Sequence, residues 1–439
     1  MSADPCTTTD ARSPAPRPLR NPPVVTSSVS GLLLLVALVM PAYAQTGSGA
    51  DQAQAPTNII AYVNRVLDAH PRVLAARSSV AAAEARARAA GRPLYNPELD
   101  AQYEDGELLV RSVGVNQTID LGNKRAARRN VASAEQQAAS EALSLVRQQV
   151  SAELLAATGG LNVATDLARI ASERKALMAR FRETANERRA AGDLNQVEAQ
   201  LAELAYVEAA LLYAQSQAEK VSAEQDLARV VGITLPPPPA LPSEYARVTL
   251  SEASIDSILN TLPSVRVAQA QIAASRATVA LRQRERRPDP TIGLYAGREG
   301  DDDLIGLRFS IPLPVSNRFR AEVDAATADL DAVTLGVDDN YRQLRAELVA
   351  AAKRYEISRA AWQEWQTVGA GSLERQIQVL EQLWRAGELS TSAYLVQLEQ
   401  ALDTQMAGVE QRGTVWTDWI AWLAVSGQVD AWMGISGTR

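Results

Sequence analysis

The chain has 439 residues, with 44 Lys and Arg against 51 Asp and Glu and a formal net charge of −7. It contains one cysteine, Cys6, and one histidine, His70, which excludes a Cys/His zinc or haem site and a disulfide framework, because each needs several such side chains. The mild acidic excess gives no electrostatic case for nucleic-acid binding, which needs clustered basic residues. We therefore expect no bound metal, no cofactor and no nucleic-acid partner.

The first residues of the chain are typical of a secretory signal. A basic segment over residues 1–30 precedes the apolar run 32–40, and Ala42-Tyr43-Ala44 follows as a small-x-small cleavage sequence. We predict a signal peptide over 1–44. The apolar run is shorter than the roughly 20 residues that a spanning helix needs, which disfavours the alternative of a retained membrane anchor.

The rest of the chain is a duplication. Beyond a polar leader over 45–56, His70-Pro71-Arg72-Val73 corresponds to Leu262-Pro263-Ser264-Val265, and the offset stays near 192 to 195 residues as far as Gly192 against Gly387. A repeat of this length is a duplicated domain rather than a solenoid unit. The expected divisions are a first repeat over 57–235, a Pro-rich linker over 236–249, a second repeat over 250–426 and a C-terminal tail over 427–439.

Each repeat is predicted to contain two columns of helix. A first helix is followed, after a short β region, by a very long helix that breaks at a glycine and returns as a helix of about half its length. Stacking the first helix on the returning one gives a second column of matching length, at about 1.5 Å per residue. The expected helices run from Thr57 to about Arg92, about 125 to 190, up to about Val231, from Leu250 to about Arg287, about 320 to 385, and up to about Ser426.

Between the first and the long helix, each repeat has two stretches in which apolar and polar residues alternate. This period of two predicts strands with one apolar and one polar face. Asp105-Gly106-Glu107 and the run 300–303 supply turn residues between the paired strands. The apolar residues expected to face lipid are Leu99, Ala101, Tyr103, Val113, Val115, Ile119, Ile292, Leu294, Ile305, Leu307, Phe309 and Ile311.

Four short two-faced strands leave an open sheet with unpaired edges. A membrane requires every backbone polar group to be paired, so strands in lipid would have to close into a barrel shared among several chains. A half-buried sheet of a soluble protein has the same alternation. The signal peptide, the duplication and the overlong helices favour the membrane barrel.

Three sets of motifs carry a family resemblance. They are Asn96-Pro97-Glu98-Leu99, the run 114–125, and Pro288-Asp289-Pro290-Thr291 followed by 306–314 and Asn317-Arg318. Taken together they resemble the TolC-like outer-membrane efflux family, and above all its heavy-metal (cobalt-zinc-cadmium, copper-silver) branch. The resemblance implies a mainly α fold with a membrane β-barrel. In such a homotrimer the four strands of each chain form a twelve-stranded outer-membrane barrel above a periplasmic helical tunnel.

The resemblance also implies a function. Such a chain is a passive exit duct in the outer membrane of a Gram-negative bacterium, with a large periplasmic part. It takes substrate, here heavy-metal cations, from a periplasmic adaptor and an inner-membrane resistance-nodulation-division pump. Two alternatives remain open, a multidrug or solvent duct of the same architecture and a periplasmic coiled-coil adaptor or scaffold. No Ser/His/Asp set, P-loop or paired-carboxylate motif supports an enzyme.

The candidate contact residues lie at the two helix reversals. The resemblance implies that the tips Gly192-Asp193-Leu194 and Gly387-Glu388-Leu389 meet the adaptor, although glycine turn chemistry alone also explains them. It places an acidic gate shortly after the second tip, but the stretch 390–396 contains no carboxylate. Glu198 and Tyr394 are therefore the candidates for a pore constriction. A solvated outer position is the alternative for Glu198.

Two further residue types are expected to be structural. All seven tryptophans fall between Trp362 and Trp432. Their helical setting favours packing within the helices over an aromatic membrane belt, because lipid-facing belts of a barrel are carried on strands.

His70 precedes Pro71 and has no second imidazole or thiolate near it in the sequence, so we expect a solvated or capping role rather than metal ligation.

Overall fold

The computed structural model describes residues 54–232 and 237–434. The predicted signal peptide, 1–44, and most of the polar leader lie outside the described residues. No helix in the described ranges combines the length and the apolar character needed to cross a membrane. The helical elements are α1 (Thr57–Ala69), α2 (Pro71–Ala90), α3 (Lys124–Ala191), α4 (Gln196–Val231), α5 (Glu252–Thr261), α6 (Pro263–Glu285), α7 (Arg320–Glu364), the π-helical turn η1 (Trp365–Gly369), α8 (Ala370–Arg385), α9 (Thr391–Val425) and α10 (Val429–Trp432).

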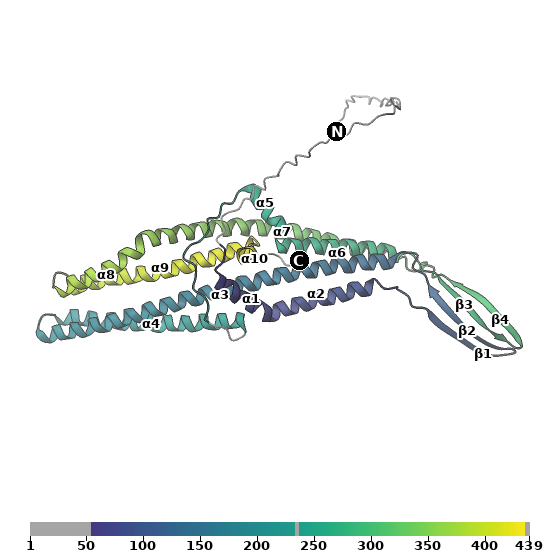
Figure 1. Cartoon of the computed structure of the whole chain (residues 1–439), viewed down its shortest axis with the longest axis horizontal. Coiled ribbons are helices and arrows are strands. Elements are labelled where there is room, and N and C mark those ends of the chain that lie inside the picture. The colour runs from purple at the N-terminus through teal and green to yellow at the C-terminus, as the bar shows by residue number, and fades with distance from the viewer. Residues whose placement is uncertain (1–53, 233–236, 435–439) are drawn as a thin grey trace, which may run out of the picture. The chain divides into compact units, whose positions relative to one another are not determined.

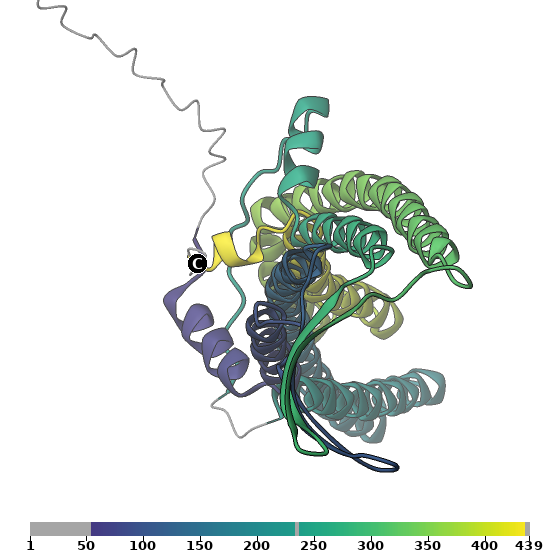
Figure 2. The ribbon, with the colours of Figure 1, turned by 90° about the vertical axis from the view of Figure 1, so that its right-hand side faces the viewer.

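The two helical columns of each repeat are present. Helices α2 and α4 both pack on the long helix α3, α2 on the part nearer the strands and α4 on the part nearer the tip (Figure 1). In the second repeat, α6 packs on α7, and α9 packs on both α7 and α8. Figure 2 views these long helices almost along their axes. The two repeats also contact each other directly, through α3 with α6 and α3 with α9.

The first helix of each repeat is broken, which the sequence prediction missed. His70 and Leu262 have extended backbones (φ −69°, ψ 126° and φ −61°, ψ 135°), and Pro71 and Pro263 begin new helices. A proline lacks an N–H and clashes with the preceding turn, so it is tolerated at a helix start and excludes α conformation from the residue before it. The paired X-Pro motif therefore marks a helix break in both repeats.

The second long helix is also not continuous as predicted. It changes to π-helix at η1 and resumes as α8, whereas the corresponding α3 runs unbroken over 68 residues. The Trp365 ring lies against two glycines at this point. A Cβ atom built on Gly369 would lie 2.4 Å from the ring, and one built on Gly408 of α9 would lie 2.2 Å from it. The wider π turn thus accompanies a bulky ring seated where both neighbours lack side chains.

The four predicted strands form one antiparallel sheet in the order β1-β2-β3-β4. They are β1 (Glu98–Asp105), β2 (Leu109–Thr118), β3 (Thr291–Glu299) and β4 (Asp302–Ser310). β1 pairs with β2 and β3 with β4 within the repeats, and β2 pairs with β3 across them. The sheet lies beyond the ends of α2, α3 and α6, at the end of the structure opposite the helix tips (Figure 1).

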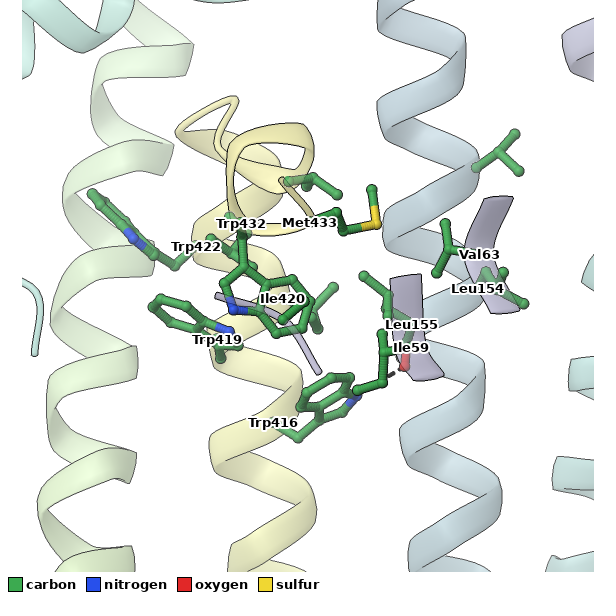
Figure 3. Packing of buried hydrophobic residues seen from close by; sticks show 14 of the residues in the cluster. Ile59, Val63, Leu154, Leu155, Trp416, Trp419, Ile420, Trp422, Trp432 and Met433 are labelled. Carbon is green, nitrogen blue, oxygen red and sulfur yellow. Dashed lines mark hydrogen bonds between the residues drawn. The ribbon is translucent and has the colours of Figure 1, made fainter. Parts of the chain in front are cut away.

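An aromatic core joins the two repeats. Trp416 is fully buried, and its indole N–H donates to the Leu155 carbonyl of α3 at 2.8 Å. Its ring centroid lies 6.0 Å from that of Trp432, which in turn lies 6.3 Å from that of Trp419 (Figure 3). The prediction that helical tryptophans pack among the helices is confirmed for these side chains.

The predicted linker and tail belong to this core where they are described. Tyr245 and Val248 of the Pro-rich segment pack against it, and the Trp362 indole N–H donates to the Ser243 carbonyl at 3.1 Å. In the tail, Trp432 and Met433 are buried, and the Trp432 carbonyl accepts from the Ala55 N–H at 2.9 Å. Packing against α7 and α9 therefore holds in place the described parts of the predicted linker and of the predicted C-terminal tail.

Two adjacent glycines of α3 test the importance of this core. A Cβ atom on Gly159 would lie 2.1 Å from the Trp416 ring, whereas one on Gly160 meets no described atom within 4 Å. Gly159→Ala should lower the free energy of unfolding by about 1–3 kcal/mol through overpacking. Gly160→Ala should raise it by about 0.5–1 kcal/mol, because alanine restricts the unfolded chain. Denaturant unfolding measures both, and equal effects would contradict the packing described.

Candidate functional site

One face of the sheet is apolar and exposed. The register aligns Leu99, Val115, Leu294 and Leu307 in one row across all four strands, and Ala101, Val113, Ala296 and Ile305 in the next. Leu99 is 77% exposed, Leu307 78% and Ile305 79%. A continuous apolar face of this kind, carried by every strand, marks a surface that contacts something other than water.

Two of the predicted lipid-facing residues lie just outside the strands. Ile119 follows the last residue of β2 and Ile311 follows that of β4, at 40% and 39% exposure. The Ile119 N–H donates to the Pro290 carbonyl at 2.8 Å and so continues the register of β2 and β3 by one pair, and the ladder ends there because proline has no N–H to donate in return. The apolar alternation therefore extends one residue beyond the regular pairing on each strand.

The opposite face of the sheet is polar and predominantly acidic. By alternation it carries one basic side chain, Arg308, and the five carboxylates Glu98, Asp100, Glu104, Glu299 and Asp302. The Arg308 guanidinium lies 5.5 Å from the Tyr295 ring and donates to Asp100 of the far edge strand at 2.5 Å.

Glycines give this ion pair its room. Gly293 and Gly114 occupy the strands between Arg308 on β4 and Asp100 on β1. A Cβ atom on Gly293 would lie 2.1 Å from the Asn116 amide oxygen, and one on Gly114 would lie 2.9 Å from the Tyr295 Cβ. The missing side chains let Arg308 reach across two strands, so the pair ties one edge of the sheet to the other.

The two predicted tips are helix reversals that lie together. Gly192 and Gly387 have positive φ values of 88° and 77°, which glycine adopts without steric cost. Arg188 near the first tip donates to the Arg385 carbonyl near the second at 3.1 Å, and its guanidinium lies 4.9 Å from the Trp384 ring. Asp193 and Glu388 are exposed, while Leu194 and Leu389 are half-buried. The acidic residues are therefore the outward part of both tips.

Tyr394, one of the two candidates for a pore constriction, is buried in this structure. Its ring is 2% exposed and stacks on Trp384, with centroids 5.0 Å apart and an interplanar angle of 15°. Phe181 of α3 packs on both rings, and burial raises the pKa of the Tyr394 hydroxyl to about 12. In this conformation the Tyr394 side chain therefore packs between α3 and α8 near the two tips, and its role at a pore constriction stays a prediction.

Glu198 has a local role that the prediction did not include. Its backbone N–H donates to the Asn195 side chain at 2.9 Å, and its carboxylate accepts from the Asn195 N–H at 3.3 Å. This reciprocal capping box starts α4 directly after the first tip. The spacing of an Asn and a Glu three residues later was the sequence signal for it.

Charged side chains join the two helical hairpins between the tips and the core. Arg174 of α3 is 5% exposed and donates to Asp403 of α9 at 2.6 Å, with Glu208 of α4 at 3.9 Å. Burial raises the pKa of the nearby Glu399 carboxyl, and the Glu208 carboxylate raises it further. Arg412 of α9 pairs with Asp166 of α3. The Arg174–Asp403 and Arg412–Asp166 pairs connect residues that are more than two hundred positions apart in sequence.

His70 starts a helix. His70 is 8% exposed, and its Nδ1 accepts from the Arg72 N–H at 3.2 Å, so it caps α2 as expected. Burial lowers the pKa of its imidazole, which favours this neutral acceptor form. In residues 54–232 and 237–434, no three His, Cys, Asp or Glu side chains are grouped so as to hold a metal ion.

Comparisons with known proteins agree with this arrangement. No protein-family model matches the chain. The cobalt-zinc-cadmium resistance protein CzcC of Cupriavidus metallidurans is 27% identical over 349 residues, which span 77% of this chain and 79% of CzcC.

Solved structures resemble the chain in fold. A crystal structure of CusC has a TM-score of 0.72 at 14% identity, covering 88% of this chain and 95% of CusC. The open-state outer-membrane channel MtrE of Neisseria gonorrhoeae has a TM-score of 0.71 at 14% identity over 86% of this chain and 91% of its own. The outer-membrane channel OprN has a TM-score of 0.70 at 17% identity over 86% of this chain and 93% of its own.

Charge substitutions on the two sheet faces test the face assignment. Leu307→Arg should destabilise the membrane-inserted form by roughly 2–4 kcal/mol if the side chain faces lipid near the bilayer midplane. Ser310→Arg, on the opposite face of the same strand, should change it little. The measurement is the amount of oligomer in the outer-membrane fraction, on gels run without boiling. Equal losses for the two variants would mean that the faces are wrongly assigned.

Proposed function

We propose that this chain, a TolC-like outer-membrane efflux protein, is the exit duct of a tripartite efflux system that exports heavy-metal cations. In this function the sheet lies in the outer membrane and the helices extend into the periplasm. The chain binds no substrate covalently and catalyses no reaction. It provides a passage, so the relevant properties are which surfaces meet lipid, which line the passage and which meet the partner proteins.

The exposed apolar face of the sheet is the observation that carries the proposal. Within the described residues, β1 and β4 each pair with one strand, so both leave an edge of N–H and C=O groups unpaired. In lipid each such group costs several kcal/mol. Pairing β4 of one copy with β1 of the next removes every edge when the ring closes. TolC-like channels are trimers, and three copies of this sheet would supply twelve strands.

The polar face of the sheet supports a cationic cargo. If the apolar face meets lipid, the face that carries Glu98, Glu104 and Glu299 lines the passage. Five carboxylates against one guanidinium give this face a net charge of −4 for each chain. Like charges converging on a narrow passage concentrate cations and repel anions. Because the described residues contain no metal-holding group, such a lining would conduct cations without retaining them.

The name of a related protein agrees with this cargo. CzcC is named as a cobalt-zinc-cadmium resistance protein, and its similarity spans more than three quarters of both chains. The fold similarity to solved outer-membrane channels argues against the adaptor or scaffold alternative, since those channels match this chain along most of their length. A drug or solvent duct would have the same architecture, so growth experiments must separate the two cargo classes.

The adaptor contact is proposed for the two tips. Asp193 and Glu388 protrude next to Gly192 and Gly387, and the Arg188 contact holds the tips side by side. A periplasmic adaptor that meets these tips would present basic or hydrogen-bond-donating residues to the two carboxylates. The inner-membrane pump of the resistance-nodulation-division class would then act through that adaptor.

Growth of a deletion strain tests the cargo. Loss of the gene should reduce growth on zinc, cobalt or cadmium salts and leave growth on hydrophobic drugs unchanged, and the wild-type gene should restore it. Sensitivity to drugs alone would replace the proposed cargo. Recovery of the protein as a soluble periplasmic product, instead of an outer-membrane trimer, would reject the duct itself.

Charge reversal tests the tips without disturbing their packing. Asp193→Arg with Glu388→Arg should abolish resistance while outer-membrane trimers stay at the wild-type level, because both side chains are exposed. Asp338→Arg, at an exposed position in the middle of α7, is the matched control and should retain resistance. Unchanged resistance in the double tip variant would show that the adaptor docks elsewhere.

A further inference from the structure

A hollow lies where the strands meet the helices. It has a volume of about 540 Å³ and is lined by the segment between α6 and β3, the segment between β4 and α7, and the start of α3. Figure 1 shows these helix ends meeting the strands. If the sheet spans the outer membrane, as in the proposed function, this junction is at the periplasmic boundary of the bilayer.

The floor of the hollow holds a carboxylate with one oxygen unpartnered. Asp289 Oδ2 accepts from Lys124 Nζ at 2.9 Å and from the Tyr95 hydroxyl at 2.7 Å. Its side chain is 4% exposed, and Oδ1 accepts no hydrogen bond from any described residue. The hydrogen bond to Asp289 raises the pKa of Tyr95 to about 12, so this phenol remains a donor. A buried acceptor without a donor is costly, so a donor supplied from outside is favoured here.

The rim of the hollow carries two guanidinium groups without a partner among the described residues. They belong to a set of four arginines near the end of α6, of which the other two are paired. Arg282 pairs with Glu285 at 2.7 Å, and Arg284 donates to the Asn123 carbonyl at 3.1 Å. The guanidinium groups of Arg286 and Arg287, both exposed, have no hydrogen-bond or ion-pair partner among the described residues. Neighbouring guanidinium groups present parallel donors that match the oxygens of a phosphate.

The third wall of the hollow is apolar. Leu313, just beyond β4, lines it and is 72% exposed, and Val315, two residues further along the chain, is 76% exposed beside it in sequence. The Phe319 ring lines the hollow although its backbone has a φ of 52°, a left-handed value that is unfavourable for an aromatic residue. The corresponding residue before α3 is Asn123, with the same φ of 52°, and asparagine tolerates this conformation better. Cations beside exposed apolar side chains are the combination found at a lipid headgroup layer.

We infer that this hollow binds the headgroup of a phosphatidylethanolamine molecule. The phosphate lies between Arg286 and Arg287, the ammonium group donates to Asp289 Oδ1, and the acyl chains leave along Leu313 and Val315. A free phosphate would leave the apolar wall uncovered, and a lipid without a donor beyond its phosphate would leave Asp289 Oδ1 unpartnered. The inference rests on the proposed function for its placement at the membrane.

Native mass spectrometry of the delipidated, detergent-purified trimer provides the test. Added phosphatidylethanolamine should bind with up to one molecule per chain, and more tightly than phosphatidylglycerol. Arg286→Gln with Arg287→Gln should weaken this binding by at least about tenfold, because two charge-assisted contacts are lost. Arg276→Gln is the matched control, an exposed arginine in the middle of α6 that does not line the hollow, and should bind as the wild type does.

Several outcomes would overturn the inference. Equal lipid binding by the double variant and the control would place the lipid elsewhere. Equal affinity for phosphatidylglycerol would reject the ammonium contact, and displacement by millimolar inorganic phosphate would identify a plain phosphate site. Loss of trimers in the double variant, with no lipid bound to the wild type, would assign the hollow to a neighbouring copy. Absence of wild-type trimers from the outer membrane would instead refute the proposed function.

Discussion

The packing of Trp416 against Gly159 is the contact on which the arrangement of the two repeats depends. It brings α9 of the second repeat so close to α3 of the first that a single Cβ atom would not fit between them. The hydrogen bond to the Leu155 carbonyl then fixes the orientation of the indole ring. Trp419 and Trp432 cover this contact, so the end of the described chain is part of the structure that holds its halves together.

The two repeats have the same order of elements, but their long helices differ in continuity. In the first repeat, α3 runs unbroken from the strands to its tip, while in the second the equivalent path is interrupted at η1. Trp365 accounts for the difference, because its ring occupies space that Gly369 and Gly408 leave empty. The corresponding stretch of the first repeat, residues 170–174, reads Ile-Ala-Ser-Glu-Arg and contains no aromatic ring to accommodate.

Strands and helices form one continuous unit because a small polar network joins them. Lys124 begins α3, Asp289 precedes β3 and Tyr95 precedes β1, so the buried contacts among them tie three chain segments at one point. On the helical side of this network, packing between helices determines the structure. On the other side, the alternation of apolar and polar residues along the strands does. The sheet faces and the helix tips are therefore separate surfaces of one chain, joined at this network.

The sequence by itself determined the features that depend on local pattern. Alternation of period two placed all four strands and their apolar face, and glycine followed by an acidic residue placed both tips, since these signals act over a few residues. The breaks at Pro71 and Pro263 and the capping box at Glu198 were also readable locally, but the repeated helical composition obscured them. Only the tertiary structure decided what long-range packing sets: the burial of Tyr394 between α3 and α8, the π-helical turn at Trp365, and the hollow around Asp289. Each of these depends on residues brought together from distant parts of the chain, and no local pattern records which side chain will fill the space beside a given glycine or carboxylate.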